Sequence, residues 1–154
     1  MGGVSYRVAC AFAAAVVACG GGYSRARAAD TTCTKEDFEA VVEAASKNLR
    51  DLNSANRPAF QEKLRELKTK RKWTYDEFMQ KATPFVRDDK TAIYDKTSDE
   101  LLSEISSMGQ AGARSGTADC ALVLELRARM KALTDTQVAK WRYMFEKLDA
   151  ELTK

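Results

Sequence analysis

Apolar residues recur at steps of three and four positions from Thr34 to the end of the chain, and this spacing constrains the fold more than any other feature. It is the period of an α-helix that buries one face. No segment alternates apolar and polar residues for long enough to predict a strand. The stripe is strongest over Val138–Leu152. We therefore predict an all-α fold in which this segment is the central helix.

The apolar stripes divide the chain into short helical segments. Their first and last apolar residues are Phe38 and Leu52, Phe60 and Leu67, Phe78 and Val86, Leu101 and Met108, Leu122 and Met130, and Val138 and Leu152. Helices of this length joined by short loops pack as a bundle. The sequence predicts a compact bundle of about five to six short helices.

Turn and cap signals set the expected boundaries. Asn53–Arg57 is predicted to be a turn before Pro58, because a proline suits the first turn of a helix. Thr74–Glu77 and Thr97–Glu100 each fit a capping box and predict helix starts. The glycines of Met108–Ala118 predict a mobile loop.

The N-terminus has the pattern of a secretory leader. Arg7 precedes an apolar run from Val8 to Ala18, which is well short of the roughly 20 residues that a membrane-spanning helix needs. Small residues follow at Ala26 and Ala28. We expect residues 1–28 to be a signal peptide cleaved after Ala28. Residues 29–154 are then a single helical domain that is periplasmic or secreted.

A second interpretation of the leader remains open. Val16–Cys19 resembles the lipobox of bacterial lipoproteins, in which a small residue precedes a cysteine that becomes lipidated. Cleavage would then fall before Cys19. The product would be a lipid-anchored envelope protein, and this is the one form in which we expect membrane attachment.

The cysteines agree with export. Removal of the leader takes away Cys10 and Cys19 and leaves Cys33 and Cys120. An even pair in an oxidising compartment predicts a disulfide. A redox-active pair is the alternative, but redox dithiols usually lie close in sequence. For so long a loop, the chain-entropy model gives about 4–5 kcal/mol of stabilisation.

The charge balance argues against a nucleic-acid binder. The chain carries 25 basic and 22 acidic residues, a net charge of +3. Arg7, Arg25 and Arg27 account for this excess, so residues 29–154 are neutral overall. Nucleic-acid binding usually needs a basic excess. We expect no nucleic-acid partner.

The residue types limit the available chemistry. The chain has no histidine, which removes the commonest general base and metal ligand. The sequence has no phosphate loop, EF-hand or nucleophile elbow. We expect no cofactor and no metal site, and an enzyme is not favoured, although arginine, lysine and glutamate alone can catalyse in a helical bundle.

Carboxylates cluster between residues 88 and 100, at Asp88, Asp89, Asp95, Asp99 and Glu100. Oxygen ligands of this kind suit a hard cation such as calcium. Basic residues interleave with them, however, and the spacing fits no calcium loop known to us. We expect a solvated segment with local ion pairs.

The basic run Lys68–Trp73 is a candidate binding surface. Lys70, Arg71, Lys72 and Trp73 are the candidate partner-binding residues, for an acidic protein or an anionic lipid headgroup. The alternative is structural. Cations gather at the C-terminal end of a helix, where the dipole favours them, and the tryptophan enters the core.

The segment Leu133–Gln137, LTDTQ, is similar to the LTxxQ pattern of the Spy and CpxP family of periplasmic helical chaperones and stress sensors. The resemblance covers fewer than about twenty residues, and it implies a helical chaperone in the envelope. The same residues also fit a capping box, with Thr134 at the N-cap and Gln137 three residues later. Leu133 and Val138 would form the hydrophobic staple. We interpret the segment mainly as a helix start.

Two functions follow from these observations. The first is an exported, non-enzymatic protein that binds another envelope protein or an anionic surface, as a chaperone, inhibitor or assembly factor does. It predicts an apolar or mixed patch on the folded surface. The second is a small-molecule carrier, or a histidine-free enzyme, with a pocket inside the bundle. The residues expected to line that pocket are Tyr75, Tyr94, Trp73, Arg50 and Arg127.

Overall fold

A computed structural model describes residues 33–115 and 119–154 of the chain. They form four helices, which are α1 (Lys35–Lys70), α2 (Tyr75–Val86), α3 (Asp89–Ser115) and α4 (Cys120–Leu152). These residues contain no strand, so the all-α prediction is confirmed for them. The predicted leader, its cleavage after Ala28 and the lipidation of Cys19 lie outside the described residues.

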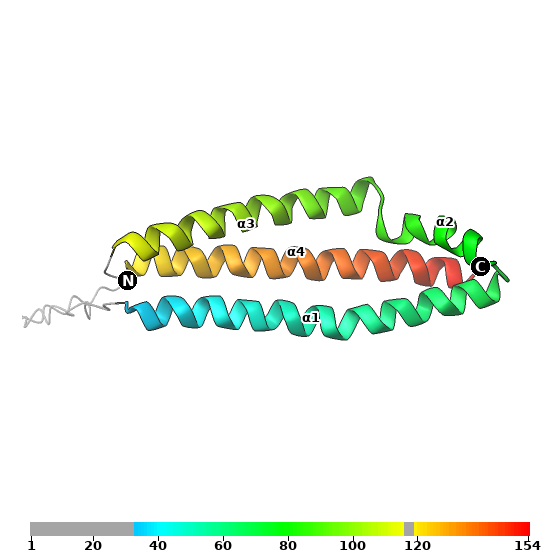
Figure 1. The fold of residues 1–154 in the computed structure, drawn as a ribbon, viewed down its shortest axis with the longest axis horizontal. Coiled ribbons are helices and arrows are strands. Elements are labelled where there is room, and N and C mark those ends of the chain that lie inside the picture. Colours follow the sequence, from blue (N-terminus) through cyan, green and yellow to red (C-terminus); the bar gives the residue numbers. More distant parts are fainter. Residues whose placement is uncertain (1–32, 116–118) are drawn as a thin grey trace, which may run out of the picture. The chain divides into compact units, whose positions relative to one another are not determined.

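Helix α4 lies between α1 and α3 (Figure 1). α1 and α4 run in the same direction, and α3 runs against both. α2 packs against the C-terminal part of α4. The predicted central segment, Val138–Leu152, is the second half of α4, and Leu148 within it is fully buried. The prediction of a central helix is confirmed.

The predicted turn at Asn53–Arg57 is wrong, because α1 continues through it with Pro58 in its interior. An interior proline removes one backbone hydrogen bond. Packing offsets this loss, since Phe60 and Leu67 are buried beyond the proline against α4. Asn56 also donates from its side chain to the carbonyl of Leu52 at 2.7 Å.

The predicted helix start at Thr134 is wrong as well, because α4 is continuous from Cys120 to Leu152. The threonines of this segment do not cap a helix. Thr134 donates from its hydroxyl to the carbonyl of Met130 at 3.1 Å, and Thr136 donates to that of Ala132 at 2.8 Å. A hydroxyl bonded back to the fourth preceding residue is tolerated within a helix. The four helices therefore replace the five to six that we predicted.

Helix α3 likewise runs through the predicted start at Thr97–Glu100. Ser98 lies inside the helix and donates to the carbonyl of Tyr94 at 2.8 Å. The helix begins instead beside Asp88. Its carboxylate accepts from the backbone N–H of Thr91 at 2.8 Å, and the Thr91 hydroxyl accepts from the N–H of Asp88 at 2.8 Å. This reciprocal cap has the logic of a capping box with the residue types reversed.

Of two other predicted boundaries, one is confirmed and one is wrong. Thr74 and Glu77 form the expected capping box, with the Glu77 carboxylate accepting from the Thr74 N–H at 3.0 Å. Of the predicted loop Met108–Ala118, residues 108–115 are the last turns of α3, so the loop prediction is wrong there. A Cβ built on Gly112 would lie 3.1 Å from the ring of Phe38, which brings α3 close to α1 at this point.

The core consists of two apolar clusters. The first contains Val41, Ala45, Val123, Leu126 and Met130. The second contains Phe60, Leu67, Met144 and Leu148. Between them along α4, polar contacts join the helices. Gln137 donates to Ser98 on α3 at 2.7 Å, and the indole of Trp141 donates to Asn53 on α1 at 3.1 Å.

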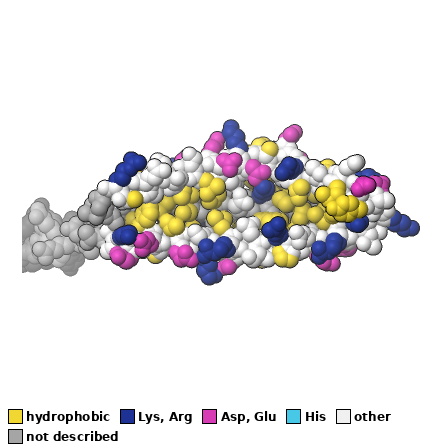
Figure 2. Space-filling model, viewed as in Figure 1, with side chains coloured by type: hydrophobic (Ala, Val, Ile, Leu, Met, Phe, Trp, Pro, Cys, Tyr) yellow, Lys and Arg dark blue, Asp and Glu magenta, His cyan; other side chains and the backbone are white. Residues whose placement is uncertain are grey.

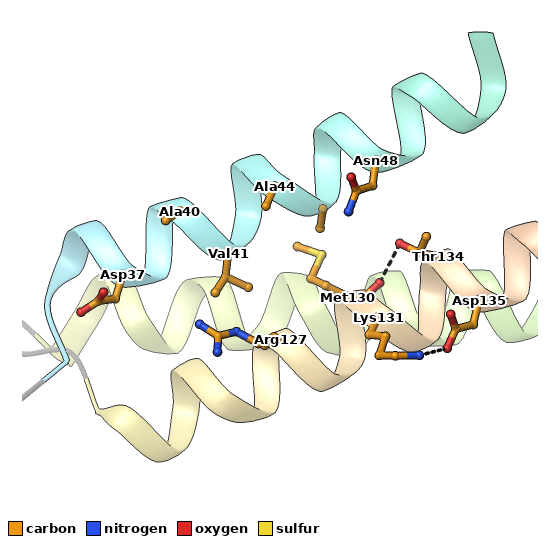
Figure 3. A pocket seen from close by; sticks show the side chains of 11 residues that line it. Asp37, Ala40, Val41, Ala44, Asn48, Arg127, Met130, Lys131, Thr134 and Asp135 are labelled. Atoms are coloured by element: carbon orange, nitrogen blue, oxygen red, sulfur yellow. Dashed lines mark hydrogen bonds and ion pairs between the residues drawn. The ribbon is translucent and has the colours of Figure 1, made fainter. Parts of the chain in front are cut away.

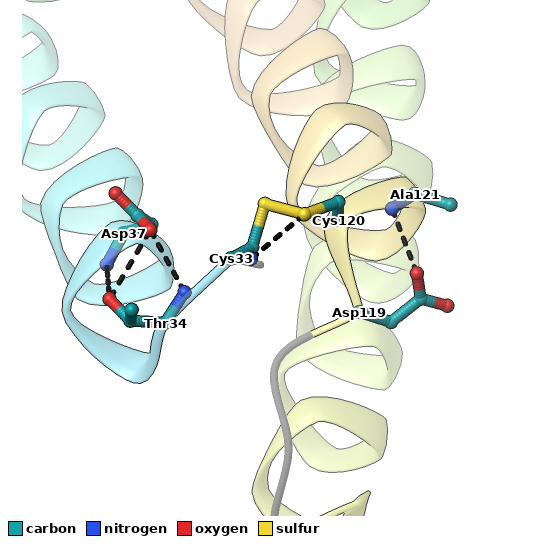
Figure 4. The surroundings of a disulfide bond; sticks show 6 residues. All are labelled: Cys33, Thr34, Asp37, Asp119, Cys120 and Ala121. Atoms are coloured by element: carbon teal, nitrogen blue, oxygen red, sulfur yellow. Dashed lines mark hydrogen bonds between the residues drawn. A yellow bond between two sulfur atoms is a disulfide. The ribbon is translucent and has the colours of Figure 1, made fainter. Parts of the chain in front are cut away.

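The predicted disulfide between Cys33 and Cys120 is present, with their Cα atoms 5.0 Å apart (Figure 4). Cys33 precedes Thr34, the N-cap of α1, and Cys120 is the first residue of α4. The backbone N–H of Cys33 also donates to the Cys120 sulfur at 2.9 Å. The crosslink therefore holds the starting ends of two parallel helices together.

Candidate functional site

A groove runs between α1 and α4, a short way along from the disulfide (Figure 3). Its volume is about 370 Å³. The groove is lined by Asp37, Ala40, Val41, Ala44, Ala45 and Asn48 of α1 and by Arg127, Met130, Lys131, Thr134 and Asp135 of α4. Val41, Ala45 and Met130 belong to the first apolar cluster, so the groove opens onto the core.

Alanines produce the groove. At Ala40, Ala44 and Ala45, the first half of α1 has side chains of one carbon where it borders α4. Farther along α1, Phe60 fills the same interface and makes edge contacts with Trp141 and Phe145 at ring distances of 5.9 and 5.4 Å. The small side chains of these alanines leave the volume of the groove unfilled between the two helices.

The rim of the groove is charged, and most of its charges are already engaged. Asp37 accepts from the backbone N–H of Thr34 at 2.9 Å in the cap of α1. Lys131 and Asp135 pair with each other at 2.5 Å. Arg127 is exposed, and within the described residues it has no hydrogen-bond or ion-pair partner. The groove thus combines an apolar floor with an unpaired guanidinium.

The apolar surface extends beyond the groove. Figure 2 shows two apolar patches along one face of the molecule, one over the half with the disulfide and one over the half with α2. The large apolar side chains that are exposed include Tyr75, Met79, Ile93, Leu102 and Leu124. Tyr75 and Met79 lie one turn apart on α2 and retain 68% and 55% of their surface.

The four residues of the predicted basic site have different surroundings in the structure. Arg71 donates to the Glu151 carboxylate at 2.7 Å, and Lys70 donates to the carbonyl of Leu152. Both cations therefore hold the C-terminal end of α4, where the helix dipole favours positive charge. Trp73 is half-buried against the second apolar cluster. Of the predicted set, Lys72 alone is exposed and unpaired within the described part of the chain.

A different basic pocket lies beside Lys72. Its volume is about 450 Å³, and it is lined by Arg65, Lys68, Thr69, Lys72 and Trp73. The candidate set Lys70–Trp73 did not include Arg65, and it left out Lys68 although the basic run begins there. Arg65 and Lys68 lie three residues apart on α1, and Lys72 follows the end of that helix.

Asp88 is the centre of a polar network at the junction of α2 and α3. Lys147 pairs with its carboxylate, and the hydroxyl of Tyr143 donates to it at 2.6 Å. These two bonds and the Thr91 N–H hold the pKa of Asp88 well below its usual range. The acceptor carboxylate raises the pKa of Tyr143 to about 12. Neither group is poised for proton transfer near neutral pH, and the network joins α4 to the start of α3.

The other carboxylates of this region are paired or dispersed. Asp95 pairs with Lys140, and Glu100 lies 3.8 Å from Lys96. Within residues 33–115 and 119–154, no group of three or more cysteine, aspartate or glutamate residues is placed to hold a metal ion. The region has the local ion pairs that the sequence predicted.

The residues predicted to line an internal pocket are not brought together. Arg127 lies in the groove near the disulfide, whereas Trp73 packs in the second apolar cluster. Arg50 pairs with Glu43 at 2.9 Å on the surface of α1. The remaining pair is also separated. The ring of Tyr94 lies 6.3 Å from the ring of Tyr143, and Tyr75 lies beside Lys68.

Comparisons with protein families, with curated proteins and with solved structures find no match to this chain. Among the described helices, none combines the length and the apolar character needed to span a membrane.

Proposed function

We propose that this protein is an exported, non-enzymatic binding protein whose α1–α4 groove holds an apolar segment of another envelope protein, as a chaperone, inhibitor or assembly factor does. One observation carries the proposal. Three buried members of the first apolar cluster, Val41, Ala45 and Met130, line the floor of the groove beside the small side chains of Ala40 and Ala44. Small residues at a helix surface let a partner's backbone or side chain come close to the floor.

The charge of the groove indicates which segment fits best. Arg127 has no ion-pair partner in the part of the chain that the structure describes and lies beside the apolar floor, so a carboxylate next to one or two apolar side chains satisfies both features. Export is supported by the leader pattern of residues 1–28 and by the Cys33–Cys120 disulfide, a bond typical of oxidising compartments.

Site-specific photocrosslinking in cells tests the groove. A photoreactive phenylalanine analogue at Ala44 is expected to give discrete protein adducts. The same analogue at Ala92, which is exposed on α3, is the matched control and is expected to give few or none. The second variant Ala40→Trp fills the groove and should remove the Ala44 adducts.

Two results would contradict the proposal. Equal adducts at Ala44 and Ala92 would mean that the contacts are not specific to the groove. No adducts at Ala44, together with a small molecule that is released on denaturation of the purified protein, would support a carrier instead.

A further inference from the structure

A second surface lies where α1 turns into α2, at the end of the molecule away from the disulfide (Figure 1). We call it the α1–α2 corner, and it consists of Arg65, Lys68, Lys72, Trp73, Tyr75 and Met79. The first four of these residues line the basic pocket of about 450 Å³, together with Thr69. The groove of the proposed function does not include any of them.

Two of the pocket's three cations have no carboxylate partner among the described residues. Arg65 pairs with Glu62 along α1. Lys68 and Lys72 have no carboxylate partner in the described part of the chain. The neighbouring cations Lys70 and Arg71 lie at the end of α4, where Lys70 donates to the Leu152 carbonyl and Arg71 pairs with the Glu151 carboxylate.

Exposed apolar side chains border this charge. The Nζ atom of Lys68 lies 5.9 Å from the ring centre of Tyr75, so the pocket and the outer face of α2 are contiguous. Met79 follows Tyr75 by one turn on the same face. Both side chains keep more than half of their surface exposed, at 68% and 55%. Trp73 completes the boundary between the pocket and the second apolar cluster.

We propose that the α1–α2 corner docks on an anionic phospholipid surface. The ammonium groups of Lys68 and Lys72 meet lipid phosphates in the pocket, and Tyr75 and Met79 enter the interfacial layer. Basic residues beside aromatic and apolar ones are the composition of interfacial membrane contacts. This docking is peripheral and does not depend on the groove or on a lipid at Cys19.

The apolar pair decides between a membrane and a soluble anion. A free phosphate ion would use Lys68 and Lys72 and leave Tyr75 and Met79 in water. A lipid surface uses all four side chains, because the phosphates and the interfacial layer lie next to each other. The tyrosine ring, with an apolar body and a polar tip, suits this layer.

Vesicle flotation with the purified full chain tests the proposal. The vesicles contain phosphatidylcholine alone or phosphatidylcholine with phosphatidylglycerol, at low and high salt. We expect binding to the anionic vesicles and little to the neutral ones. The double variant Lys68→Gln/Lys72→Gln should weaken anionic binding by roughly tenfold or more. Tyr75→Ser/Met79→Ser should weaken it severalfold while leaving the charge unchanged.

A charge-matched control separates the corner from net charge. Lys35→Gln/Lys96→Gln removes two exposed lysines, each of which lies beside a glutamate elsewhere on the surface. This control should change binding by less than about twofold. Any contribution of residues 1–28 is the same in every variant. Circular dichroism confirms that each variant is folded.

Three results would overturn the proposal. The first is equal binding to neutral and anionic vesicles, or none to either. The second is an equal loss in the control and in Lys68→Gln/Lys72→Gln. The third is saturable binding of glycerol phosphate without vesicles, unaffected by Tyr75→Ser/Met79→Ser, which would mark a site for soluble phosphate.

Discussion

The side-chain amide of Gln137 on α4 donates a 2.7 Å hydrogen bond to the hydroxyl of Ser98 on α3. Ser98 is 5% exposed, and its own proton goes to the carbonyl of Tyr94 at 2.8 Å. The bond lies along α4 between the two apolar clusters. A polar pair that is satisfied in only one alignment selects the register in which α3 packs on α4.

Removal of one partner should expose this role. In Ser98→Ala, the Gln137 amide loses its acceptor in a half-buried position, and we expect the free energy of unfolding to fall by about 1–2 kcal/mol. In Ser98→Ala/Gln137→Leu both polar groups are gone, and the loss should be smaller than the sum of the two single losses. Urea denaturation of the four proteins measures the coupling. Strict additivity would show that the bond contributes nothing.

The disulfide should matter most for the pairing of α1 with α4. Cys33→Ser/Cys120→Ser removes the crosslink between the helix starts, and the free energy of unfolding is expected to fall by about 2–5 kcal/mol. Urea denaturation with and without a reductant measures the loss. The reductant should destabilise the wild type by a similar amount and leave the double variant unchanged. An equal effect of the reductant on both would mean that it acts elsewhere.

The Asp88 network predicts a dependence of stability on acid. Bonds from Lys147 and Tyr143 lower the folded-state pKa of Asp88 below its ordinary value of 3.8. The resulting stabilisation is therefore present above about pH 4 and is lost as the pH falls below it. Asp88→Asn should destabilise the protein at pH 7, and its difference from the wild type should shrink toward pH 2. A difference that stays constant over this range would contradict the prediction.

The same network predicts an alkaline effect through Tyr143. Its folded-state pKa is about 12 against an ordinary value of 10.0, chiefly because its proton is bound by the Asp88 carboxylate. The stabilisation is complete below pH 10 and is lost as the pH rises from 10 to 12. Tyr143→Phe lacks the titrating hydroxyl, so the free energy of unfolding of this variant should fall less steeply over that interval. Thermal denaturation at several pH values, with absorbance of the phenolate, measures both quantities.

The sequence predicted the apolar faces better than the helix ends. The stripe on Val138–Leu152 depends only on which side chains avoid water, and α4 is central as expected. The predicted helix boundaries near Pro58 and at Thr134 are wrong because turn and cap signals are local. Long-range packing keeps α1 and α4 continuous through these positions. The capping box at Thr74 was predicted correctly, since Thr74 and Glu77 bond to each other at the start of α2.

For the candidate sites too, some features could be predicted from the sequence and others depend on packing. The Cys33–Cys120 pair could be predicted because only two cysteines follow residues 1–28, the predicted leader. The groove could not be predicted, since it depends on which face of α1 meets α4. Alanines such as Ala44 carry no distinctive sequence signal. The basic pocket was missed in part because Lys70 and Arg71, which adjoin Lys72 in sequence, point to the end of α4.

The glycines of α3 provide a final test of whether residues 108–115 are helical. Glycine within a helix costs roughly 0.5–1 kcal/mol relative to alanine. A Cβ at Gly109 meets nothing within 4 Å, so Gly109→Ala should raise the free energy of unfolding by that amount. A Cβ at Gly112 lies 3.1 Å from the ring of Phe38, so Gly112→Ala should gain less or lose stability. If the segment were the loop that its glycines suggest, neither substitution would gain helix propensity and neither would meet the ring. Equal and negligible changes in urea denaturation would therefore contradict the helical end of α3 and its close approach to α1.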